Sequence, residues 1–182
     1  MPLLVETNPP ANERDLRAVE DSLGGPLPAA LRALLSQYDG AQTYADGGQL
    51  GWVLHGADAS RIVRDGALAR SPDAEEFLEY VRDAYGPRPP LVAETASFSS
   101  WIGTQGAEGG DGFPREHVCV AAHWVHHGSV WAPLRADATE LIILPSPRFD
   151  DDPSEALSAA LRGPRVALDG FVSALLAGDE PL

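Results

Sequence analysis

Residues 12–40, NERDLRAVEDSLGGPLPAALRALLSQYDG, decide the fold because they encode two short amphipathic helices joined by a tight turn. Asn12 can cap a helix that runs from about residue 13 to residue 23, and Gly24-Gly25-Pro26 ends it. Pro28 can take the first position of a second helix, which Asp39-Gly40 stops. Neither helix can bury its apolar side alone, so both must pack on a sheet or on other helices. The apolar residues that recur at helical spacing are Leu16, Val19 and Leu23 in the first helix and Leu31, Leu34, Leu35 and Tyr38 in the second; we expect Leu27, Leu34 and Tyr38 in the core.

The rest of the chain alternates short apolar runs with turn residues, which is typical of strands followed by a few helices. We expect one α+β domain over residues 1–182, in which residues 1–12 form an N-terminal arm. Two N-terminal helices and a C-terminal helix should pack on a mainly antiparallel sheet of about four to six strands. The expected strands are 50–55, 91–94, 98–102, 118–125, 129–131 and 141–144, and the further helices are a weak one at 59–69, one after Ser71-Pro72, and those at 153–161 and 168–176.

Composition narrows the classes of function. The 182 residues include 44% hydrophobic residues, enough for a sizeable core, and carry a net charge of −14. A chain this acidic, without a dense basic cluster, does not suit nucleic acid or an anionic membrane, and a basic protein partner fits it better. No run is long and apolar enough for a membrane span or a signal peptide, so we expect a cytoplasmic protein. Cys119 is a single thiol and cannot form an internal disulfide, which agrees with a reducing compartment.

The helix pair and the end of the chain carry a resemblance to a known family. Leu23-Gly24 closes the first helix, Leu27-Pro28 opens the second, and Asp39-Gly40 ends it. Leu168 to Leu176 is similar to a closing helix of the pattern Ser-Phe-x-x-Phe-Leu, and 106–112 could match a Gly-rich turn. In these features the chain resembles the SUKH superfamily, also called the SMI1/KNR4 family. Further positions of the N-terminal pattern are Asn8-Pro9-Pro10-Ala11-Asn12-Glu13, Leu16, Glu20, Leu31, Leu34-Leu35 and Tyr38.

The resemblance implies an α+β protein-binding module. Bacterial members are often immunity proteins that neutralise a cognate toxin, and fungal relatives act as signalling scaffolds. Glu20 matches an inward glutamate of the family pattern, and we expect it to cap or pair with the second helix. The expected function is therefore stoichiometric binding, with occlusion of a basic toxin domain such as a nuclease, and the alternative is a regulatory module without a toxin.

Two residue classes are the candidates for contacting a partner. Loop carboxylates project into solvent and can steer a basic protein, and tryptophans are common anchors of interfaces. For any single tryptophan, however, a place in the core or in a cleft is the commoner role. The candidates are Trp52, Trp101 and Trp131, together with Glu108, Asp111, Asp150, Asp151 and Asp152.

The sharpest alternative is a small metal-dependent enzyme built on residues 117–127. In a regular strand His117, Cys119 and His123 share one face, so their side chains could converge on zinc. A single Cys within an alternating strand is more often a small buried residue, and we expect no metal. Residues 106–112 lack the Lys of a phosphate loop, and no G-x-S-x-G turn surrounds Ser97, Ser99 or Ser100, so we expect no cofactor and no catalytic residue.

Overall fold

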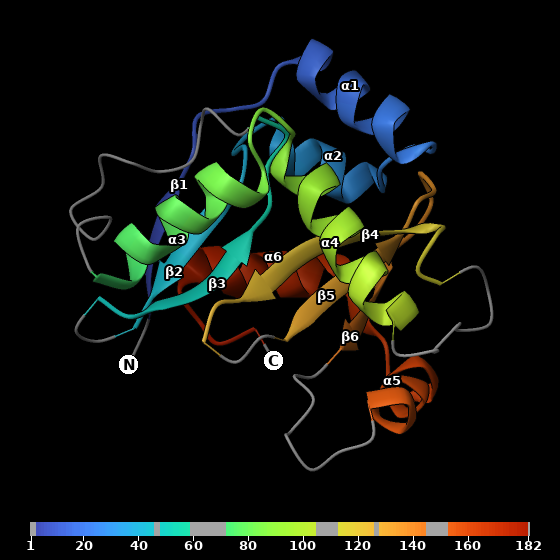
Figure 1. Ribbon diagram of the computed structural model, residues 1–182. Coiled ribbons are helices and arrows are strands. Elements are labelled where there is room, and N and C mark those ends of the chain that lie inside the picture. The colour runs from blue at the N-terminus through green and yellow to red at the C-terminus, as the bar shows by residue number, and fades with distance from the viewer. Residues whose placement is uncertain are drawn as a thin grey trace.

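A curled antiparallel sheet runs through the centre of the molecule (Figure 1). The computed structural model describes residues 3–45, 48–58, 72–104, 113–125, 128–144 and 153–181. Within these residues the sheet has seven strands, and each pairs with the next along the chain, in the order β1 to β7. The elements are β1 (Leu4–Thr7), α1 (Glu13–Leu23), α2 (Ala29–Leu35), β2 (Ala41–Tyr44), β3 (Leu50–Leu54), α3 (Pro72–Ala84), α4 (Pro90–Thr104), β4 (His117–His123), β5 (Ser129–Pro133), β6 (Glu140–Leu144), α5 (Pro153–Arg162), β7 (Val166–Ala167) and α6 (Leu168–Ala177).

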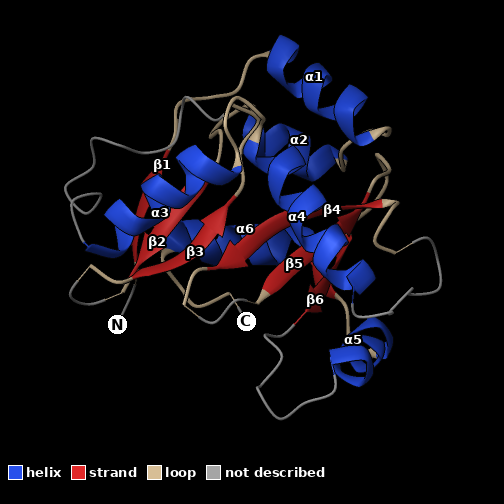
Figure 2. Ribbon diagram, in the orientation of Figure 1, coloured by secondary structure: helices blue, strands red, loops and turns tan. Residues whose placement is uncertain are grey.

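Helices cover both faces of this sheet. α3 and α4 lie on the face turned to the viewer in Figure 2, and α6 lies behind the strands. Strand β3 shows why both faces are apolar, because its neighbouring residues point to opposite sides. Trp52 and Leu54 join the core beneath α1, α2 and α6, whereas Val53 packs with Phe77 of α3. The α+β class and the antiparallel sheet are thus confirmed.

The two N-terminal helices form where they are predicted, except that Pro28, expected at the first helical position, is the N-cap residue of α2. The side chain of Asn12 accepts a hydrogen bond from the N–H of Asp15 at 3.0 Å, and Gly24 ends α1 at a φ of 77°. Glu20 joins the two helices, since its Oε1 accepts from the N–H of Leu27 at 3.1 Å and lies 3.3 Å from Nε of Arg32. Its structural role, pairing with the second helix, is confirmed.

Tyr38 corrects one part of that prediction. Leu27 and Leu34 are buried as expected, but the side chain of Tyr38 is 37% exposed. The prediction assumes that the helix continues to residue 38, but α2 ends at Leu35 and Tyr38 lies beyond it. The i, i+7 relation holds only while the helix continues.

The strands predicted at 91–94 and 98–102 are wrong, because both segments belong to α4. The proline pair before them starts a helix: the N–H of Ala93 bonds to the carbonyl of Pro89 at 2.9 Å. Leu91, Thr95, Phe98 and Ile102 fall on one side of that helix at spacings of four, three and four. Two apolar runs that look separate in the sequence are therefore one stripe packed on the sheet.

The described sheet has seven strands, against the four to six expected, because short strands form at its edges. Residues 4–7, expected within an arm, form β1 and pair with β2 in a register that joins Leu4 to Tyr44. β2 has the sequence AQTY, whose polar residues are buried, so it lacks the alternation expected of a half-buried strand. The N–H of Leu3 bonds to the carbonyl of Gly178, which brings the two ends of the chain together. The helix expected at 59–69 lies outside the described residues.

Candidate functional site

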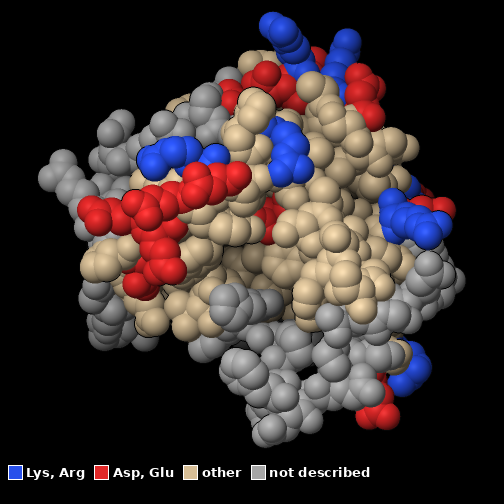
Figure 3. Space-filling view, in the orientation of Figure 1, with Lys and Arg blue, Asp and Glu red and all other residues tan. Residues whose placement is uncertain are grey.

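A cavity of about 310 Å³ opens between α3, α4 and the strands β3 and β4. In the space-filling view this face is hollowed near its centre, beside the acidic side chains of α3 (Figure 3). Aromatic side chains form much of its wall, and a few polar groups stand among them. A mostly apolar cavity with a few converging polar groups is the usual form of a binding site. The lining residues include His55, Phe77, Tyr80, Tyr85, Glu94 and Trp124.

Glu94 supplies the buried carboxylate of the cavity. It lies on α4, and only 3% of its surface is exposed. Its Oε1 accepts a hydrogen bond from the hydroxyl of Tyr85 at 2.5 Å and another from the hydroxyl of Tyr80 at 3.0 Å. Among the residues that the structure describes, no arginine forms an ion pair with Glu94. The acid is therefore held by hydroxyl groups and not by a positive charge.

The two tyrosines keep their protons in this setting. Burial, followed by the nearby charge of Glu94, raises the pKa of Tyr85 and of Tyr80 well above the ordinary value for a phenol. Both hydroxyls thus remain donors toward Glu94 throughout the physiological range. The same two causes raise the pKa of the fully buried Cys119, which favours the protonated thiol.

His55 is the second polar group that faces the cavity. It follows β3, is 2% exposed, and its backbone N–H bonds to the carbonyl of Val120 at 3.0 Å. Neither ring nitrogen has a hydrogen-bond partner within the described part of the chain. Burial lowers the pKa of His55, and the charge of Glu94 opposes that shift only in part. The imidazole is therefore neutral at pH 7, with one donor and one acceptor nitrogen available.

Asp39 holds the loop that follows His55. Its buried carboxylate accepts hydrogen bonds from the backbone N–H groups of Ala57, at 2.5 Å, and Asp58, at 3.1 Å. Gly56 comes directly before these two residues, and an added Cβ there would collide with the carbonyl oxygen of Asp39. Only glycine fits this contact, so Asp39 and Gly56 together determine the path of the chain behind the cavity.

The stability of the protein should fall with acid because of His55. The unfolded imidazole titrates near pH 6.5, whereas burial lowers the pKa in the folded state, so the unfolded chain binds more protons below that pH. The free energy of unfolding should therefore decrease between pH 7 and pH 5.5, by at most about 1.4 kcal/mol per pH unit for one proton. Urea denaturation at several pH values measures this slope.

His55→Gln should flatten this pH dependence, and the partly exposed His123 offers a matched control. His123→Gln removes an imidazole that is not fully buried and shows how far the slope depends on another histidine. An unchanged slope in His55→Gln would contradict the assignment of the acid sensitivity to this buried ring.

The three tryptophans proposed as partner contacts lie in different environments. Trp131 is fully buried, and its indole N–H donates to Oγ of Ser129 at 2.9 Å. Trp52 is 4% exposed and donates to Glu180 at 2.9 Å. Trp101 is 39% exposed on α4. Trp131 is thus a core residue with no surface to offer a partner, and Trp101 is the one of the three with an open side chain. The loop candidates Glu108, Asp111, Asp150, Asp151 and Asp152 lie outside the described residues.

The proposed convergence of His117, Cys119 and His123 is wrong. β4 pairs Cys119 with Trp131 and then Ala121 with Val130, so Val120 is an extra residue in a bulge. The bulge turns the following residues to the other face, where the ring of His123 lies 5.1 Å from that of Trp52. No group of three metal-binding side chains occurs in the described residues.

Sequence reasoning missed the cavity residues His55, Tyr80, Tyr85 and Glu94. Glu94 was assigned to a strand, where a lone acid between apolar runs carries no particular meaning. On the helix that actually forms, it interrupts an apolar side between Leu91 and Thr95, and that interruption is the signal that could have found it.

Comparison of the chain with models of protein families, with curated proteins and with solved structures found no match. None of the described helices is long and apolar enough to cross a membrane.

Proposed function

We propose that the chain is a non-enzymatic, SUKH-type protein-binding module that acts in the cytoplasm as an immunity protein. It would neutralise a basic bacterial toxin domain, such as a nuclease, by stoichiometric binding that covers the functional face of the toxin. The observation that carries the proposal is the exposed acidic side of α3, which borders the aromatic cavity. Such a surface attracts a basic partner and presents it with an anchoring site.

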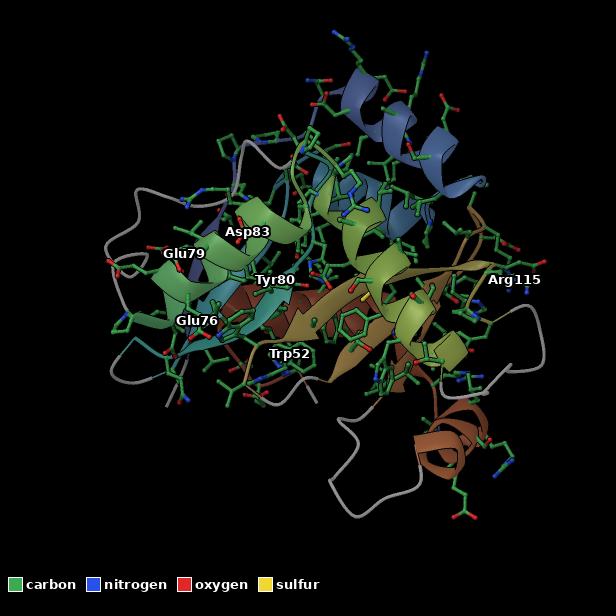
Figure 4. The ribbon with its side chains drawn as sticks, in the orientation of Figure 1. Trp52, Glu76, Glu79, Tyr80, Asp83 and Arg115 are labelled. Atoms are coloured by element: carbon green, nitrogen blue, oxygen red, sulfur yellow. The ribbon has the colours of Figure 1, made fainter. Side chains whose placement is uncertain are left out.

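Acidic residues outnumber basic ones on α3. The sequence of the helix, PDAEEFLEYVRDA, contains five acids and one arginine. Glu75, Glu76, Glu79 and Asp83 are exposed. Figure 4 labels three of these acids along α3 next to Tyr80. The net charge of −14 adds a long-range field of the same sign.

The test of this proposal begins with identification of the partner. The immobilised chain is used to capture proteins from a lysate of the encoding bacterium, and a captured protein is then produced alone and together with the chain. The expected result is a one-to-one complex and growth arrest by the captured protein, relieved when the chain is present. A captured partner that is not toxic would overturn the immunity role and favour a regulatory module. A toxic partner whose toxicity the chain does not relieve would also overturn the immunity role.

The association rate with that partner should fall steeply as salt is raised. Between 0.05 M and 0.5 M NaCl we expect a decrease of about tenfold or more, with little change in dissociation, since ions screen exposed charges beyond a few ångströms. The triple change Glu75→Gln, Glu76→Gln and Glu79→Gln should also slow association. Stopped-flow mixing measures both effects.

A control for this variant removes three exposed acids from other elements: Asp21→Asn, Glu116→Gln and Asp179→Asn. Both variants lose three negative charges. If α3 steers the partner, association should slow less in the control than in the α3 variant. Equal rates for the two variants would show that the acidic side of α3 has no special part in recognition.

A further inference from the structure

The cavity around Glu94 combines an aromatic wall with a buried carboxylate. Resting on the proposed function, we propose that it receives the guanidinium of an arginine side chain of the basic partner. The arginine would lie against the aromatic wall and direct its N–H groups to Glu94 and His55.

The aromatic wall suits a planar cation. The rings of Phe77 and Trp124 lie 5.3 Å apart, and those of Tyr80 and Trp124 lie 5.7 Å apart. Tyr85 extends the wall, with its ring 5.8 Å from that of Tyr80. Faces of aromatic rings attract cations, and guanidinium stacks on them more readily than ammonium does. The wall thus provides apolar contact and favours arginine over lysine.

The cavity offers two hydrogen-bond acceptors to a cation: the carboxylate of Glu94 and one ring nitrogen of His55. Glu94 carries a carboxylate that no described arginine neutralises, and the neutral ring of His55 has two unpartnered nitrogens. The chain contains no lysine, so a cation from within the described residues would have to be an arginine. A guanidinium has five N–H donors and no acceptor, which is the complement that Glu94 and one nitrogen of His55 require.

The cavity is reached from the acidic side of α3. Tyr80 is 36% exposed while its hydroxyl bonds to Glu94, so one side chain spans the path from the surface to the buried acid. Figure 3 shows the hollow next to the acidic side chains of α3, and Figure 4 labels Tyr80 beside them. A basic partner drawn to α3 therefore arrives with its positive side chains near the opening.

The first experiment needs no partner. The folded protein is titrated with N-acetyl-arginine amide while NMR follows the indole signals, including that of Trp124. The expected result is saturable one-to-one binding of the arginine probe. The neutral isostere N-acetyl-citrulline amide should bind with at least tenfold lower affinity. Equal binding of the two probes, or no saturable binding of the arginine probe, would overturn the proposal.

Two variants locate that binding. Glu94→Gln should weaken it at least tenfold, whereas Glu116→Gln, which removes the same charge from an exposed position outside α3, should change it by less than twofold. Should Glu94→Gln fail to fold, Tyr80→Leu removes part of the aromatic wall at a half-exposed position and should weaken binding at least threefold. An unchanged affinity in both Glu94→Gln and Tyr80→Leu would contradict the proposal.

The partner then separates this inference from the proposed function. With the captured protein, Glu94→Gln should speed dissociation at least tenfold and Glu79→Gln should mainly slow association, because buried pairs act on dissociation and rim charges on association. Toxin relief without an effect of Glu94→Gln would remove the cavity proposal and keep the proposed function. Arginine binding in the cavity without a toxic partner would keep the cavity proposal and overturn the immunity role.

Discussion

Trp131→Ala should lower the free energy of unfolding by about 3–5 kcal/mol, the range for removal of a large buried aromatic side chain. Trp131 is fully buried in β5, and its ring centroid lies 5.3 Å from that of Phe113 and 6.3 Å from that of Phe98. The change opens a cavity and also removes the indole N–H that bonds to Ser129. Urea denaturation followed by circular dichroism measures the loss without relying on tryptophan fluorescence.

Trp101→Ala is the matched control, because it removes the same side chain from an exposed position on α4. The free energy of unfolding should fall by less than about 1 kcal/mol, as for most surface substitutions. A loss for Trp131→Ala no larger than that of Trp101→Ala would contradict the placement of Trp131 in the core.

Asp39→Ala should be the second strongly destabilising change, with an expected loss of about 2–6 kcal/mol in the free energy of unfolding. The carboxylate accepts from the N–H groups of Ala57 and Asp58, and Asp39 itself is fully buried. Truncation leaves a buried donor at Ala57 and a part-buried donor at Asp58 without their acceptor, at about 1–3 kcal/mol for each donor. Thermal and urea unfolding give the size of the loss.

Asp39→Asn keeps one side-chain oxygen and should fall between the wild type and Asp39→Ala. Stability equal to the wild type in Asp39→Ala would show that the loop after β3 does not depend on this carboxylate. Because the loop begins beside His55, the same variant should also disturb the cavity, which the arginine titration would detect.

Elements with strong local signals were predictable from the sequence. Asn12 and Gly24 bound α1 through hydrogen bonds and backbone angles that depend on a few neighbouring residues. α6 was expected over 168–176 and extends from Leu168 to Ala177, with Phe171 and Leu175 in the core as the helical spacing indicates. α4 was missed because apolar runs of four or five residues fit either a strand or part of a helix.

The candidate site was beyond prediction because it depends on long-range packing. His55, Tyr80, Tyr85 and Glu94 come from three separate segments, and no spacing in the sequence relates them. The bulge at Val120 has a similar consequence for His123: one extra residue turns the rest of the strand over, and nothing in the sequence near Cys119 announces it.

The sequence by itself determined the α+β class, the N-terminal helix pair, the closing helix and the strongly negative charge, because each follows from local residue chemistry or from simple counting. Only the tertiary structure decided which tryptophans are buried, which face His123 takes, and that Glu94 meets two tyrosines beside an unpartnered histidine. Those features arise where distant segments pack against one another. Burial and pairing are properties of the assembled core, and the same residue type serves the core at Trp131 and the surface at Trp101.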